Sequence, residues 1–229
     1  MPKQLDVAVD GITLRVRVWA AEERVRPPVV LLPATGDTAE DWDVIASSLH
    51  SSRTVYAVNL RGHGPSDWPG QYSIQAMADD VVGLLRQLDD RPVDLVGHSL
   101  GGLVACSVAS AHPDLVRRLV LEDVGVPHAR PAVAPPRPAG VLDFDWRVVE
   151  QVRPEIDDPD PRWADVVARI AAPALVIAGG PSSPVPRDHI AELVRTVRDG
   201  QLVNVDAGHL VHATSPDEFG RHLLRFLDA

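Results

Sequence analysis

Residues 93–105 read VDLVGHSLGGLVA, and this stretch decides the fold. The apolar run at 93–96 has the composition of a strand that is buried on both faces of a sheet. Gly-x-Ser-x-Gly follows it, and apolar residues then recur at helical spacing from 103 to 111. This order predicts a sharp strand-to-helix turn with Ser99 at its tip, because glycine two residues on either side relieves crowding there.

The rest of the chain also alternates strand and helix. Residues 4–9 and 12–19 alternate apolar and polar side chains around Asp10-Gly11, which predicts a hairpin. Short apolar runs typical of buried parallel strands lie at 29–32, 54–59, 119–121 and 175–178, with a weaker eighth candidate at 202–205. Helical spacing occurs at 39–49, 74–88, 190–197 and 217–227. We therefore expect an α/β fold with a mostly parallel, eight-stranded, doubly wound sheet.

Residues 124–161 interrupt this alternation and hold eight of the 21 prolines. Proline is excluded from helix interiors and central strands, so we interpret the segment as an irregular excursion, a short lid over one end of the sheet. A flexible linker between two domains is the alternative. We favour a single domain over residues 1–229, since the strands on either side of the segment complete one sheet.

Composition excludes several classes of partner. The chain has 229 residues, is 45% hydrophobic and carries a formal net charge of −10. That charge argues against nucleic acid and anionic membranes as partners. Cys106 is the single cysteine, so no internal disulfide forms. The N-terminus does not read as a secretory signal, and no apolar run approaches the roughly 18 residues of a membrane span, so we expect a cytoplasmic protein.

The turn at Ser99 suits nucleophilic catalysis. It pushes the hydroxyl clear of the sheet, and the backbone N–H of Leu100, at the start of the following helix, faces any oxyanion that forms there. A glycine-rich turn that binds phosphate is the alternative. The chain contains no Gly-x-x-x-x-Gly-Lys-Ser/Thr motif, so we disfavour that alternative.

Three motifs in this order resemble the α/β-hydrolase fold family. They are GHSLGG at 97–102, NLRGHGPSD at 59–67 and AGHLVH at 207–212, and the resemblance covers nearly the whole chain. In that family the first motif carries the nucleophile and the last carries the catalytic histidine. The resemblance therefore implies a serine hydrolase with Ser99 as nucleophile.

His209 is the expected general base among nine histidines. It follows the last strand candidate, which places it at the sheet edge where Ser99 also lies, and the resemblance selects the same residue. We expect His98 to point away and pack, His63 to brace the turn, and His212 to line or support the site. No His-Glu-x-x-His or paired Cys/His spacing occurs, so we expect neither a metal nor a cofactor.

The acid that orients His209 departs from the family's commonest pattern. Most members carry it as Gly-x-x-Asp after the strand at 175–178, where this chain has GGPSSPVP and Ser182 stands at the expected position. Some members place the acid after the preceding strand, and that register points to Asp123. A strand-end acid that only caps its loop is the alternative reading of Asp123. Glu122, Asp206 and Asp188 remain the other candidates.

The second oxyanion donor is expected in the loop after residues 29–32. The resemblance points to the backbone N–H of Thr35. Ala34 replaces the glycine of many relatives, which is tolerable only if Ala34 avoids positive φ.

The resulting hypothesis is two-step acyl transfer on a small-molecule substrate: an ester, a thioester or a lactone. The short lid favours a small substrate, and Phe144, Trp146 and Trp163 are candidates for an apolar wall or for the core. A lyase or C–C bond hydrolase of the same fold in a biosynthetic pathway is one alternative, and a non-catalytic binding protein is another. The sequence fixes neither the substrate nor the oligomeric state.

Overall fold

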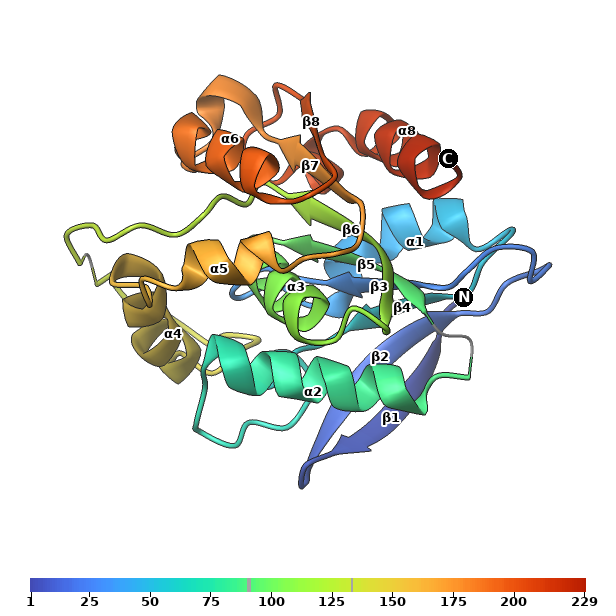
Figure 1. Cartoon of the computed structure of the whole chain (residues 1–229). Helices are drawn as coiled ribbons and strands as arrows, with labels where there is room; N and C mark the ends of the chain where they lie inside the picture. The colour runs from blue at the N-terminus through green and yellow to red at the C-terminus, as the bar shows by residue number, and fades with distance from the viewer. Residues whose placement is uncertain (90–91, 133) are drawn as a thin grey trace.

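The computed structural model describes residues 1–89, 92–132 and 134–229. Within them, eight strands form one sheet in the order β1-β2-β4-β3-β5-β6-β7-β8 (Figure 1). The strands are β1 (Lys3–Val9), β2 (Ile12–Trp19), β3 (Val29–Leu32), β4 (Val55–Val58), β5 (Val93–His98), β6 (Val116–Glu122), β7 (Ala174–Ala178) and β8 (Gly200–Asn204). Every strand candidate of the sequence, the weak eighth included, corresponds to one of them, and the predicted fold class is confirmed.

The strand directions also follow the prediction. β1 and β2 form an antiparallel hairpin whose turn residues, Asp10 and Gly11, both have positive φ (40° and 81°), as a two-residue type I′ turn requires. β2 pairs antiparallel with β4, and all the remaining pairs are parallel. The central strands β3 and β5 are buried along their whole length, because helices cover both faces.

Helices cover the sheet on both sides (Figure 1). α1 (Asp43–Leu49) and α8 (Pro216–Leu227) pack against one face in a core centred on Trp42 and Phe219. α2 (Ile74–Gln87), α3 (Leu100–Ala111) and α6 (Arg187–Thr196) contribute to the core on the other face. The shorter elements are η1 (Ala39–Trp42), α5 (Trp163–Ala168), η2 (Gly180–Ser182) and α7 (Val211–Thr214).

The segment 124–161, called the lid segment below, leaves β6 and returns toward β7, and these two strands are hydrogen-bonded neighbours. Residue 133 of this segment lies outside the described residues. The expectation of a wholly irregular path is wrong for α4 (Arg147–Asp157), which contains Pro154. Proline in a helix interior costs about 3 kcal/mol. Burial of Val148 and Val152 offsets this, because each fully buried valine contributes roughly 1.5–3 kcal/mol.

The topology places the candidate site. Because parallel strands share a direction, the segments that follow β3, β5, β6, β7 and β8 all leave the sheet at one edge. Thr35, Ser99, Asp123, Ser183 and His209 lie on these segments. Along the described residues, no helix is both long and apolar enough to cross a bilayer.

Candidate active site

Ser99 lies at a strained turn between β5 and α3. Its φ of 49° and ψ of −115° belong to a region that non-glycine residues rarely adopt. The surrounding backbone holds it there: its N–H donates to the carbonyl of Glu122 at 3.2 Å, and its carbonyl accepts from the N–H of Gly102 at 2.9 Å. The hydroxyl is therefore presented at the edge of the sheet by fixed backbone.

The glycines around Ser99 permit close backbone contacts. A Cβ on Gly97 would lie 2.3 Å from the carbonyl oxygen of Gly101. A Cβ on Gly101 would lie 2.5 Å from the carbonyl oxygens of Leu32 and Pro33, and one on Gly102 would lie 2.3 Å from a methyl of Val124. Only glycine lets α3 begin this close to the ends of β3 and β6.

Asp123 contacts His209 directly. Asp123 Oδ2 lies 2.6 Å from His209 Nδ1, and the Asp123 side chain is fully buried whereas that of His209 is 31% exposed. The backbone N–H of Gly179 donates to Asp123 Oδ1 at 2.9 Å, and the Ser183 hydroxyl donates to Oδ2 at 2.5 Å. Gly179 and Ser183 thus orient the Asp123 carboxylate, and that carboxylate orients the His209 ring through Nδ1.

The other candidate acids are engaged elsewhere. Glu122 is buried and accepts hydrogen bonds from the backbone N–H of His212 at 2.8 Å and from His212 Nδ1 at 2.8 Å. Asp206 is exposed and lies 3.4 Å from the Ser182 hydroxyl, and Asp188 is exposed in the first turn of α6. Of the four candidates, all within the described residues, Asp123 is the one that contacts His209.

Ser183 is a site residue that the sequence reasoning missed. The sequence drew attention to Ser182, but it is the Ser183 hydroxyl that reaches Asp123. The same oxygen accepts the N–H of Val185 at 2.9 Å, so its proton is directed to the carboxylate. A serine in the loop after β7, where many relatives carry the acid, could have indicated a contact with the Asp123–His209 pair, because that loop lies beside the pair.

Ring contacts run in series from His209 to His98, His212 and Trp42. His98 is buried, but its ring lies 4.7 Å from that of His209, so it does not point away from the site as expected. The His212 ring lies 5.4 Å from that of His98 and stacks on Trp42 at 4.2 Å. Burial lowers the pKa of His98 to about 4, so this imidazole is neutral at pH 7.

His63 lies outside this cluster. It is fully buried, stacks on Phe144 of the lid segment at 5.8 Å, and has its pKa lowered by burial to about 4. Its Nδ1 lies 3.1 Å from the carbonyl of Arg61. His63 therefore joins the loop after β4 to the lid segment.

One group of side chains among the described residues has donor atoms close enough for a metal ion: His98, Glu122 and His212, all within 4.8 Å of one another. Both Glu122 oxygens already accept hydrogen bonds from His212. This internal pairing accounts for their closeness, so we assign the group to support of the site.

Asp37 was also missed by the sequence reasoning. It follows β3, and its carboxylate lies 3.9 Å from His98 Nδ1. Burial, with a further contribution from the charge of Asp41, raises its pKa to about 6. A carboxylate of raised pKa thus lies beside the His98 ring.

Thr35 and Leu100 are the residues expected from the sequence to donate to an oxyanion. Both line the same cavity as Ser99. The N–H of Leu100 is in the first turn of α3 and so has no partner within the helix. Ala34 is not among the described residues with positive φ, so its backbone tolerates alanine where many relatives have glycine.

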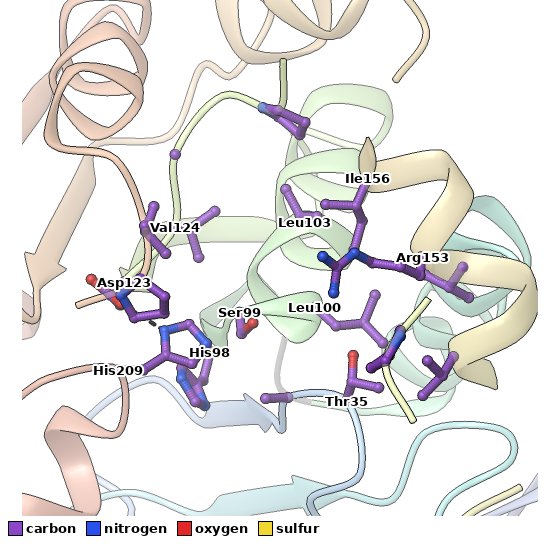
Figure 2. A pocket seen from close by; sticks show the side chains of 18 of the residues that line it. Thr35, His98, Ser99, Leu100, Leu103, Asp123, Val124, Arg153, Ile156 and His209 are labelled. Atoms are coloured by element: carbon purple, nitrogen blue, oxygen red, sulfur yellow. Dashed lines mark hydrogen bonds and ion pairs between the residues drawn. The ribbon is translucent and has the colours of Figure 1, made fainter. Parts of the chain in front are cut away.

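The site opens into a cavity of about 700 Å³ under the lid segment. Figure 2 shows Ser99, Asp123 and His209 along one side of this cavity, with Leu100 and Thr35 beside the serine. Phe144 and Trp146 line it, whereas Trp163 packs in the core. A volume in this range suits a small-molecule substrate.

Comparison with known proteins establishes the family. The sequence profile of the alpha/beta hydrolase fold matches residues 27–156, and the chain belongs to that family. It is 27% identical to the mouse sn-1-specific diacylglycerol lipase ABHD11 over 88% of this chain and 81% of that protein.

Two further similarities are partial or structural. An uncharacterized protein of Mycobacterium tuberculosis is 42% identical over 100 residues, which are 43% of this chain, and the match spans only 29% of that longer protein. The crystal structure of the enol-lactonase from Burkholderia xenovorans LB400 superposes with a TM-score of 0.88 at 24% identity, covering 98% of this chain and 100% of that one. The latter likeness concerns the fold.

Proposed function

We propose that this chain is a serine hydrolase that cleaves a small ester, thioester or lactone through an acyl-enzyme on Ser99. The observation that carries the proposal is the 2.6 Å contact between buried Asp123 and His209, in the cavity whose wall holds Ser99 on a strained turn. Ser99, Asp123 and His209 come from three segments and line the same cavity, which supports a role in nucleophilic catalysis.

In the first step the Ser99 oxygen attacks the substrate carbonyl carbon while His209 Nε2 takes the hydroxyl proton. The N–H groups of Leu100 and Thr35 donate to the oxyanion of the tetrahedral intermediate. Asp123 keeps the His209 Nδ1 proton in place and stabilises the imidazolium. His209 then gives its proton to the leaving alcohol or thiol as the carbon–oxygen or carbon–sulfur bond breaks.

The second step hydrolyses the acyl-enzyme and regenerates the free enzyme. Water attacks the acyl-enzyme carbonyl and loses a proton to His209, and the same N–H groups hold the new oxyanion. The Ser99–acyl bond breaks, Ser99 regains its proton from His209, and a carboxylic acid leaves.

Active-site labelling tests the proposal directly. A fluorophosphonate probe should label the wild-type chain, and Ser99→Ala and His209→Ala should abolish labelling. Ser48→Ala is the matched control, because Ser48 is an exposed serine of α1 that lies outside the cavity. Equal labelling of wild type and Ser99→Ala would reject Ser99 as the nucleophile.

A panel of p-nitrophenyl esters tests the reaction class. Ser99-dependent release of p-nitrophenol with turnover supports an ester hydrolase. Labelling of Ser99 without turnover of any ester would favour the lyase or C–C bond hydrolase, since those reactions use the same base on a different bond. Neither labelling nor turnover would favour a binding protein.

A further inference from the structure

Arg153 points into the cavity from α4 and has no role in the chemistry described above. Figure 2 shows its guanidinium between Ile156 and Leu100, on the side of Ser99 away from His98 and His209. Its neighbours on the cavity-facing side of α4 are apolar: Val149, Val152 and Ile156. A guanidinium is an unusual group on an apolar wall, and its hydrogen-bond partners decide whether it is free to bind a ligand.

Arg153 and Arg130 share a single carboxylate. Arg153 Nε donates to both oxygens of Asp157 at 2.8 Å, and Arg130 Nε donates to Asp157 Oδ1 at 2.6 Å. The structure records no hydrogen bond from the terminal Nη atoms of either arginine to any described residue. Each guanidinium therefore keeps the two-nitrogen edge that binds an oxyanion in bidentate fashion.

The charges of this group do not cancel. The Asp157 side chain is buried; burial acts to raise its pKa, but hydrogen bonds from Arg153 and Arg130 outweigh this and lower it. Two guanidiniums and one carboxylate leave one net positive charge, in a chain whose formal net charge is −10. Both arginines line the cavity, with side chains 35% and 44% exposed.

We propose that Arg153 and Arg130 form a carboxylate-binding subsite for the far end of the acyl substrate, with Asp157 holding the two guanidiniums in place. The inference rests on the proposed function and names its substrate class: esters, thioesters or lactones whose acyl part ends in a carboxylate. Leu100 and Ile156, which line the cavity on either side of the Arg153 guanidinium, offer apolar surface to the methylenes that join the two groups. Figure 2 shows His98 on the other side of Ser99 from Arg153, and the Asp37 carboxylate lies 3.9 Å from His98 Nδ1. Asp37 therefore repels a carboxylate from the His98 side of the cavity and favours one orientation of the substrate.

Two substrates that differ in one carboxylate test this subsite: 4-nitrophenyl butyrate and the mono-4-nitrophenyl ester of glutaric acid. We expect wild-type kcat/KM to favour the glutarate ester by about tenfold or more, as a charge-assisted bidentate contact allows. Arg153→Gln should reduce this ratio by about tenfold and Arg130→Gln by less, mainly through KM. Arg153→Lys, which keeps the charge but loses the paired nitrogens, should fall between wild type and Arg153→Gln.

Arg162→Gln is the matched control. Arg162 is an exposed arginine whose partner is Asp160, and it does not line this cavity, so the ratio should stay at the wild-type value. Each single variant leaves one arginine on Asp157, and thermal unfolding checks that the fold is retained. A wild-type ratio of one or below, or a ratio unchanged in both Arg153→Gln and Arg130→Gln, would overturn the subsite.

A binding measurement separates this inference from the proposed function. In the Ser99→Ala chain, calorimetry should detect glutarate, and Arg153→Gln in that background should weaken it about tenfold. If Ser99→Ala binds glutarate but the wild-type chain turns over no ester, the subsite is retained and the hydrolase is rejected. If the wild-type chain turns over the butyrate ester but Ser99→Ala does not bind glutarate, the hydrolase is retained and the subsite is rejected. Inorganic phosphate that binds as tightly as glutarate would overturn the choice of a carboxylate.

Discussion

Asp123 and His209, 86 positions apart in the sequence, are joined by a 2.6 Å contact between Oδ2 and Nδ1 at the carboxyl edge of the sheet. Asp123 follows β6, and the loop that carries His209 follows β8. The N–H of Gly208 donates to the carbonyl of Gly179 at 2.8 Å, and Gly179 in turn donates to Asp123. The backbone of the loop after β7 thus fixes both partners.

Asp123→Asn tests the role of this contact. Asparagine tolerates the positive φ of 50° at this position, so the backbone should be retained. The amide cannot stabilise an imidazolium and favours the wrong tautomer, so we expect kcat/KM for an active ester to fall by about 10³–10⁴-fold. Steady-state kinetics on p-nitrophenyl esters measures this.

The matched control is Asp206→Asn, because Asp206 is exposed and does not contact His209. It should stay within about twofold of wild type, as expected for a surface substitution. If Asp206→Asn lost as much activity as Asp123→Asn, the assignment of the acid would be wrong.

Ser183→Ala tests a positioning residue. The change removes a hydrogen bond to a carboxylate, and such bonds contribute about 1.5–3 kcal/mol, so a loss of roughly tenfold or more in kcat is expected with little change in KM. Ser183→Thr keeps the hydroxyl and should restore most of the rate. If Ser183→Ala equalled wild type in kcat and in its pH profile, the hydroxyl would have no part in orienting Asp123.

The sequence was sufficient for the sheet and for the turn at Ser99 because both depend on local patterns. Apolar runs of three to six residues identify buried strands, and glycine spacing identifies a close approach of backbone. α4 was missed because proline argues against helix locally, whereas the burial of Val148 and Val152 that stabilises it depends on tertiary structure.

The parts of the site that the sequence left open depend on contacts between distant loops. Four acids were compatible with the sequence, and only the register of β6 against β7 brings Asp123 to the loop that carries Ser183. Asp37 and Arg153 have no motif at all. Their importance comes from the cavity they border, which no local pattern encodes.

Gly101→Ala should destabilise the fold. Its Cβ would lie 2.5 Å from two carbonyl oxygens, Leu32 and Pro33, and backbone cannot move aside as a side chain can. We expect a loss of about 1–3 kcal/mol in the free energy of unfolding, measured by urea denaturation.

Gly220→Ala is the contrasting variant. It lies inside α8, and nothing is found within 4 Å of its added Cβ. Alanine should stabilise the fold by about 0.5–1 kcal/mol. Equal effects of the two alanines would show that close backbone packing at the turn is not what requires glycine.

His63 should make stability depend on pH. Burial lowers its folded pKa from 6.5 to about 4, so between these values the unfolded chain binds a proton that the folded chain does not. Stability from this residue is fully present above pH 6.5 and is lost as the pH falls toward 4, by about 1.4 kcal/mol per pH unit. His63→Phe keeps a ring against Phe144 and removes the titration.

The experiment measures the unfolding free energies of wild type and His63→Phe in urea from pH 4.5 to 7.5. As the pH falls, wild type should lose more stability than the variant. The raised pKa of Asp37 gives a pH dependence of the opposite sign, which cancels in the difference because both chains retain Asp37. A difference that is flat over this range would show that His63 titrates normally in the folded chain.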